Sequence, residues 1–208
     1  MEYRQTVART GNPRFPDWDY WGKPVPGYGD PGARLLLTGL APAAHGGNRT
    51  GRVFTGDKSG DFLVKCLYHV GLANQSRSES LEDGLKLHRT YITPVLKCVP
   101  PKDKPTAQEL SNCSDFLHRE LGLLREVRCV MALGRIAFDQ SIRLWKSRFS
   151  LRSRDFPFGH GEIFTLPDGR YLVASYHPSP RNVNTGRLTW EMMTTLLETA
   201  KELARTGP

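Results

Sequence analysis

The chain has 208 residues, and its 29 Lys and Arg against 21 Asp and Glu give a formal net charge of +8. Hydrophobic residues make up 38% of the chain and charged residues 24%, which is typical of a globular protein and excludes a disordered one. The apolar runs are too short to cross a bilayer, and no apolar signal-peptide core follows Met1. We therefore expect a cytoplasmic protein without membrane contact, in which four scattered cysteines remain reduced.

The excess of positive charge favours a polyanionic partner, although many enzymes are simply basic. Residues 142–154 contain five basic side chains and no acidic one. This stretch is either the solvated end of a helix or a patch that binds phosphates.

Residues 1–33 are rich in proline, glycine and aromatic residues and show no periodicity. We expect them to form an extended arm that packs on the core, and residues 34–208 to form a single domain. Residues 34–40 and 90–96 each have the pattern of a buried strand. Between them, the spacing of Phe62, Cys66 and Val70 predicts a helix that begins at an N-cap, Ser59.

Thr106 and Glu109 form a capping-box pattern ahead of an apolar helical face that continues to Leu124. A strand at 127–133, a helix at 136–145, a hairpin of residues 162–166 and 171–175, and a helix at 188–203 follow. This alternation predicts an α/β fold, a three-layer α/β/α sandwich with a central, mostly parallel four-stranded sheet.

Three loops rich in Gly, Pro, Asn, Asp and His follow the predicted strands, at residues 39–57, 98–105 and 177–182. The carboxyl ends of parallel strands meet at one edge, so these loops can converge on a common site.

The first loop contains five glycines in nineteen residues, which lets the backbone approach a ligand closely. It lacks the Gly-Lys-Ser/Thr of a P-loop and the spacing of a dinucleotide-binding motif. A long surface loop without chemistry is the alternative.

The second and third loops offer Asp103, placed between two lysines, and His177, placed where a strand ends among prolines. Asp103 is either a functional carboxylate or a solvated turn residue, and His177 is either functional or structural. Cys98 and Cys113 can meet if the following helix folds back, although each alone fits core packing.

In combination, these stretches resemble the uracil-DNA glycosylase superfamily, specifically its type-5 family. The resemblance runs from about Tyr20 to Arg205. The segments that match in order and spacing are residues 24–31, 39–57, 97–105, 132–137 and 175–189.

The resemblance implies a DNA repair enzyme that flips uracil, and other deaminated bases such as hypoxanthine, out of DNA and hydrolyses the glycosidic bond. It implies a monofunctional, monomeric enzyme acting on nucleoid DNA and leaving an abasic site. The implied catalytic residues are Asp103, Asp57 and His177; Phe54, Ala43 and Gly39 would bind the base; and Ser179, Arg181, Asn182, Lys102 and Lys104 would contact DNA.

The chain departs from the family pattern in two places. The position of Asp103 usually carries asparagine, so a carboxylate there could act as a base as well as a water ligand. The family also binds a 4Fe–4S cluster through four cysteines, of which Cys98 and Cys113 match two. The other pair, a C-x-x-C motif, does not occur in the sequence, and we expect it upstream of Met1.

Two other functions remain open. One is a non-catalytic protein that binds damaged DNA on the same scaffold, and the other is a hydrolase of free nucleosides or nucleotides. The basic surface disfavours the second.

Overall fold

A computed structural model of the chain describes residues 2–146 and 148–207. Its centre is a six-stranded sheet in the order β1-β3-β2-β4-β6-β5. The four inner strands are parallel: β2 (Leu35–Gly39), β3 (Thr90–Pro94), β4 (Cys129–Leu133) and β6 (Tyr171–Ser175). Two short strands, β1 (Tyr28–Gly29) and β5 (Ile163–Thr165), pair antiparallel at the edges. The predicted parallel sheet and hairpin are confirmed, and β1 and β5 extend four strands to six.

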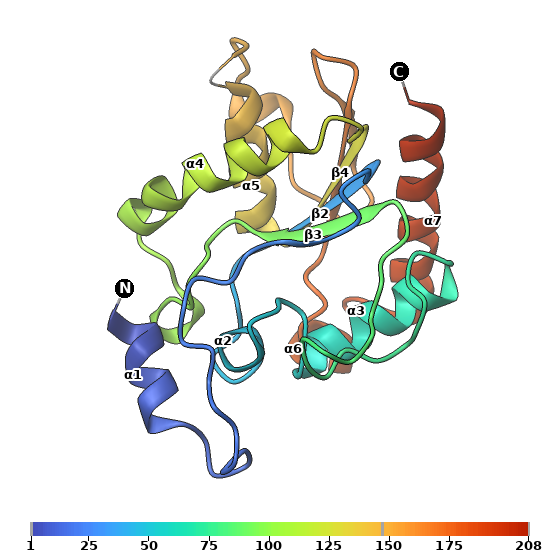
Figure 1. Cartoon of the computed structure of the whole chain (residues 1–208). Helices are drawn as coiled ribbons and strands as arrows, with labels where there is room; N and C mark the ends of the chain where they lie inside the picture. Colours follow the sequence, from blue (N-terminus) through green and yellow to red (C-terminus); the bar gives the residue numbers. More distant parts are fainter. Residues whose placement is uncertain (1, 147, 208) are drawn as a thin grey trace.

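Helices cover both faces of the sheet (Figure 1). Helices α3 (Lys58–His69) and α7 (Trp190–Thr206) lie on one face, and α4 (Ala107–Leu123) and α5 (Arg135–Lys146) lie on the other. Successive residues of β2 serve the two layers in turn, because side chains alternate along a strand: Leu35 and Leu37 join the core under α3 and α7, and Leu36 joins the core under α4 and α5. The three-layer α/β/α sandwich is therefore confirmed.

The helix starts test the capping predictions. Thr106 caps α4 as predicted, because its hydroxyl accepts from the Glu109 backbone at 3.2 Å and the Glu109 carboxylate accepts from the Thr106 backbone at 2.7 Å. The predicted N-cap of α3 is wrong: the cap is Asp57, and Ser59 is one of the residues whose backbone N–H it accepts. A carboxylate at this position also interacts favourably with the helix dipole.

The first 33 residues are not extended throughout. They begin with α1 (Glu2–Thr10), which packs beside α2 (Gly47–Thr50). Its one buried residue is Val7, so α1 lacks the apolar stripe that would have revealed it. The Arg4 guanidinium donates to Gly22 O at 3.1 Å and holds α1 against the rest of the arm. The division into an arm and a domain at residue 33 stays a prediction.

The remaining elements are short: α6 (Pro180–Asn184) and two 3-10 turns, η1 (Pro101–Asp103) and η2 (Ser153–Asp155). Among the described residues, no helix has the length and apolar character needed to cross a membrane.

Candidate active site

The loops that follow the parallel strands meet at the carboxyl edge of the sheet. The backbones of Val95 and Leu96 donate to Gly39 O and Leu40 O, each at 2.9 Å, and join the second loop to the first. Gly134, after β4, donates to Ser175 O at 2.8 Å, at the end of β6. These bonds hold together the strand ends from which the loops start, and a ring contact between Phe54 and His177 joins the first loop to the third.

Phe54 and His177 lie against each other at this edge, with ring centroids 5.9 Å apart and planes inclined by 32°. Phe54 has a φ of 51°, a left-handed conformation that costs a non-glycine residue free energy and is typical of functional sites. A Cβ at Gly39 would come within 2.8 Å of the Phe54 ring, so only glycine at the end of β2 lets this ring settle there. The structure thus joins three of the predicted site residues in one contact.

The His177 imidazole is held in its neutral form. Burial lowers its pKa from 6.5 to about 4, because desolvation disfavours the charged ring. Asn182 donates its side-chain amide to His177 O at 2.9 Å and thereby fixes the loop. At neutral pH the ring can donate a hydrogen bond from one nitrogen without carrying a charge.

A cavity of about 790 Å³ opens beside this pair and brings together residues from five parts of the chain. Asp57, Asp103 and Ala43, all predicted site residues, line it together with Pro180 and part of the N-terminal arm. Phe54 and His177 are not among its lining residues, so the cavity and the aromatic pair are two adjoining parts of the edge, connected by the chain between Phe54 and Asp57.

The Asp57 carboxylate is held by one oxygen. Its Oδ1 accepts from the backbones of Ser59 and Gly60, both at 3.0 Å, as the cap of α3. Its Oδ2 lies over Gly46, where a Cβ would be 2.1 Å away, and accepts no hydrogen bond from the described residues. Burial raises the pKa of Asp57, while the two backbone N–H groups lower it. The group is a carboxylate with one restrained and one free oxygen at the cavity wall.

Asp103 has a different setting. It is exposed, and both it and Lys102 have positive φ values, 55° and 53°. This strained turn in η1 brings the Asp103 side chain to the cavity rim, while Lys102 and Lys104 are exposed beside it.

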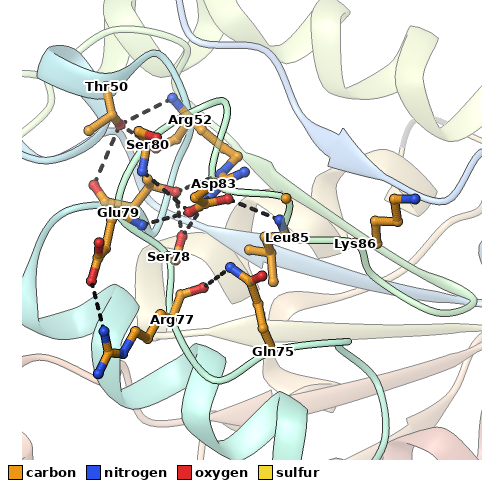
Figure 2. A network of polar contacts seen from close by, with 12 residues as sticks. Thr50, Arg52, Gln75, Arg77, Ser78, Glu79, Ser80, Asp83, Leu85 and Lys86 are labelled. Carbon is orange, nitrogen blue, oxygen red and sulfur yellow. Dashed lines mark hydrogen bonds and ion pairs between the residues drawn. The ribbon is translucent and has the colours of Figure 1, made fainter.

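A network of polar contacts, which the sequence analysis missed, holds the first loop (Figure 2). Arg52 is 5% exposed and pairs with Asp83 at 2.6 Å, and it donates to Thr55 and Ser78 at 2.9 and 3.2 Å. Asp83 also accepts from the backbones of Glu79 and Leu85. The network therefore ties the segment between α3 and β3 to the glycine-rich loop. The signal for it in the sequence was Arg52, a charged residue inside a glycine-rich loop.

The third loop also positions its predicted DNA-contacting residues at the edge. Ser179 caps α6 by accepting from the Asn182 backbone at 3.4 Å, and Arg181 is exposed on that short helix.

The basic stretch of residues 142–154 lies in another part of the molecule. Helix α5 follows a parallel strand and runs back along the sheet, and Trp145 donates to Asp168, in the turn that precedes β6, at 2.7 Å. The start of this stretch therefore lies at the end of the sheet opposite the candidate site, and phosphate binding by it stays a prediction.

Cys98 and Cys113 are both buried and close enough for the charge of one to affect the other. The Arg4 guanidinium donates to the Cys98 sulfur at 3.2 Å; burial raises the pKa of this thiol and Arg4 opposes the rise. Cys66 and Cys129 lie in the core under α3 and α7, where burial raises the pKa of each thiol to about 12.

A 4Fe–4S cluster requires four thiolates, and the described residues hold no group of three or more side chains suited to a metal ion. The residues present therefore do not fit a complete cluster, although Cys98 and Cys113 could supply two ligands.

Comparisons with known proteins agree with this geometry. A profile of the Uracil DNA glycosylase superfamily matches residues 26–201. A type-5 uracil-DNA glycosylase of Thermus thermophilus is 53% identical over 186 residues, covering 89% of this chain and 82% of its own length. One from Pyrobaculum aerophilum is 47% identical over 200 residues, covering 96% and 84%. A type-4 uracil-DNA glycosylase of Archaeoglobus fulgidus is 30% identical over 159 residues, covering 74% and 70%. With a superfamily profile over most of its length and these relatives, the chain belongs to the type-5 family of uracil-DNA glycosylases.

Proposed function

We propose that the protein excises uracil from DNA by hydrolysis of the bond between the base and deoxyribose, and that it leaves an abasic site. The observation that carries this proposal is the Asp57 carboxylate, fixed at the start of α3 in a cavity that also holds Asp103 and Ala43. Its chemistry suits a water-activating base, since one oxygen is free to accept a proton and burial raises its pKa.

In the proposed reaction, the target nucleotide leaves the duplex and enters this edge of the sheet. A water molecule held by Asp57, with Asp103 at the rim, attacks the sugar carbon. The new carbon–oxygen bond forms as the bond to the base breaks, the electron pair leaves with the base, and the water proton passes to the carboxylate.

The aromatic pair serves the departing base. The ring of Phe54 offers a face on which any base can stack, and its support by Gly39 fixes the orientation of that face. The neutral His177 imidazole donates a hydrogen bond to the negative charge that develops on the base, which is stabilisation of the oxyanion type.

The site selects loosely among bases, because Ala43 contributes no polar group and Phe54 stacks without reading base edges. We therefore extend the proposal to hypoxanthine and other deaminated bases. Exposed Lys102, Lys104 and Arg181 contact DNA phosphates, and Ser179 and Asn182 brace the backbone where the base leaves.

The enzyme is proposed to be monofunctional and monomeric and to act on cellular DNA. A strand-cleaving lyase needs an amine that attacks the sugar, and Lys58 is the one lysine among the described residues that line the cavity, where it is exposed. Burial lowers the pKa of Lys97, but its ammonium donates to both Glu120 oxygens, at 2.8 and 2.7 Å, and it does not line the cavity. Borohydride added during turnover should therefore trap no covalent complex with DNA.

Cys98 and Cys113 would supply two of the four thiolates of a 4Fe–4S cluster, which would have no part in the hydrolysis.

The decisive experiment incubates the protein with duplexes that each carry one lesion and reveals abasic sites with alkali. Cleavage at uracil supports the proposal. Binding without cleavage supports the non-catalytic DNA-binding alternative. The absence of both binding and cleavage supports a hydrolase of free nucleosides or nucleotides.

Variants then test the residues. Asp57→Asn should lower single-turnover excision by about 100-fold or more, and Phe54→Ala and His177→Ala should lower excision far more than DNA binding. Asp115→Asn and Phe116→Ala, exposed on α4, are matched controls that should leave both unchanged. Equal losses of binding and excision at Phe54 and His177 would contradict their roles.

A further inference from the structure

Arg49 is a buried cation whose charge is not neutralised by an acid in direct contact. Arg49 is 4% exposed, and among the described residues no carboxylate forms an ion pair with it. Instead, its guanidinium lies between two aromatic rings of the N-terminal arm, 3.8 Å from the ring centre of Phe15 and 4.0 Å from that of Trp18. An unpaired charge in a protein interior is costly, so this arrangement calls for a function.

The hydrogen bonds of Arg49 join its side chain to two backbone carbonyls of the first loop, one at His45 and one at Gly56, next to Asp57. Its Nε donates to His45 O at 2.7 Å and its Nη2 donates to Gly56 O at 3.0 Å. Gly56 has a φ of 70°, and a Cβ there would come within 2.3 Å of the Arg49 Nη2. The guanidinium thus fills the space that this glycine leaves and fixes the backbone immediately before Asp57.

Arg49 and Asp57 also interact through their charges. Burial raises the pKa of Asp57, and Arg49 opposes this rise. Burial lowers the pKa of Arg49, and the charges of Tyr20 and Asp57 oppose this fall. Both residues line the same cavity. Asp61, on α3, raises the pKa of Asp57. The other charged or titratable groups that line the cavity are Arg14, His45, Lys58, Glu79 and Asp103.

The arm that carries the two rings is held independently of them. The backbones of Trp21 and Gly22 donate to Arg49 O and Asn48 O at 3.0 and 3.1 Å. Phe15 and Trp18 line the cavity as well, so the arm forms one of its walls.

We propose that Arg49, clamped between Phe15 and Trp18, is a positioning residue for base excision that fixes the Asp57 segment and presents a positive charge to its carboxylate. This inference rests on the proposed function, in which Asp57 is the base. It assigns the N-terminal arm to the active site, and it explains a buried arginine that is held by aromatic rings and carbonyl groups.

The test measures single-turnover excision from a uracil-containing duplex between pH 4.5 and 8.5, for the full chain and for variants whose folding is checked by circular dichroism. Arg49→Met removes the charge and the two hydrogen bonds while keeping an unbranched chain. It should lower the rate by on the order of tenfold to 100-fold through misplacement of the base, and it should move the acid limb of the profile to higher pH, because Asp57 then loses a favourable charge. A merely structural role would lower the rate without moving this limb.

Arg49→Lys keeps the charge and should return the acid limb toward its wild-type position while the rate stays reduced. Phe15→Leu combined with Trp18→Leu should reduce the rate with less effect on the limb, and this variant tests the clamp even where Arg49→Met does not fold. Arg119→Met, at an exposed cation on α4, is the control and should change neither.

An unmoved limb in Arg49→Met would overturn the inference whatever the rate, as would a wild-type rate in the Phe15 and Trp18 double variant. Asp57→Asn separates this outcome from failure of the proposed function. If Asp57→Asn loses excision while Arg49→Met behaves as the wild type, only the role of Arg49 is refuted. Wild-type excision in Asp57→Asn refutes the base assignment and the inference with it.

Discussion

The depressed pKa of His177 makes the stability of the protein depend on pH in a way that a single variant can isolate. The imidazole titrates at about 4 in the folded protein and at its ordinary value of 6.5 in the unfolded chain. The unfolded state therefore binds the proton more readily, and folding loses stability as the pH falls below 6.5, with the full loss reached below 4. A shift of this size corresponds to about 3 kcal/mol, of which about 2 kcal/mol is lost between pH 7 and pH 5.

The assay is urea unfolding of the wild type and of His177→Gln at pH 7 and pH 5. Glutamine does not titrate, so the wild type should lose about 2 kcal/mol more than the variant between the two pH values. Burial also lowers the pKa of His160, but His160 is present in both proteins and its contribution cancels. Equal losses in the two proteins would show that the His177 ring keeps its ordinary pKa, and the lowering of this pKa by burial would be refuted.

Three further predictions concern residues that hold the site. Gly39→Ala places a Cβ 2.8 Å from the Phe54 ring and should lower single-turnover excision by on the order of tenfold; an unchanged rate would show that the position of this ring is unimportant. Asp83→Ala leaves Arg52 buried without its partner and should lower the free energy of unfolding in urea by roughly 3 kcal/mol, whereas a loss within experimental error would mean that Arg52 is solvated. Thr106→Ala removes the α4 cap and should cost about 1 kcal/mol in the same assay, with excision unchanged.

Much of the fold could be predicted because its signals are local. The inner strands are short apolar runs. The capping box is recognisable because Thr106 and Glu109, three residues apart, bond each other's backbone N–H groups. Helix α1 was missed because tertiary contacts, such as the one from Arg4 to Gly22, hold it in place of an apolar stripe. The start of α3 was misplaced because Ser59 and Asp57 are both good caps, and only the backbone decides which of them accepts.

The sequence predicted which loops and residues form the candidate site better than it predicted how these residues contact one another. The loops and their reactive residues follow from the order of strands, and Phe54, Gly39 and His177 do come together. The buried arginines of the first loop could not be assigned, since Arg49 and Arg52 have their partners up to 34 residues away in sequence, at Phe15 and Asp83. Such partners are defined by folding, and no spacing in the sequence indicates them.

Asp57 caps α3 and is also the proposed base, so the fold and the proposed chemistry of this site depend on each other. As the cap of α3, its carboxylate accepts most strongly when ionised, because the anion makes stronger hydrogen bonds to the two backbone N–H groups and benefits from the helix dipole. As a base, it must bind a proton during the reaction, and burial, which raises its pKa, assists this step. Since Oδ1 alone makes the cap, Oδ2 can take the proton while the helix start stays intact. In the proposed reaction, the free oxygen and the glycine at position 46 that makes room for it therefore allow one carboxylate to hold the helix and act on water.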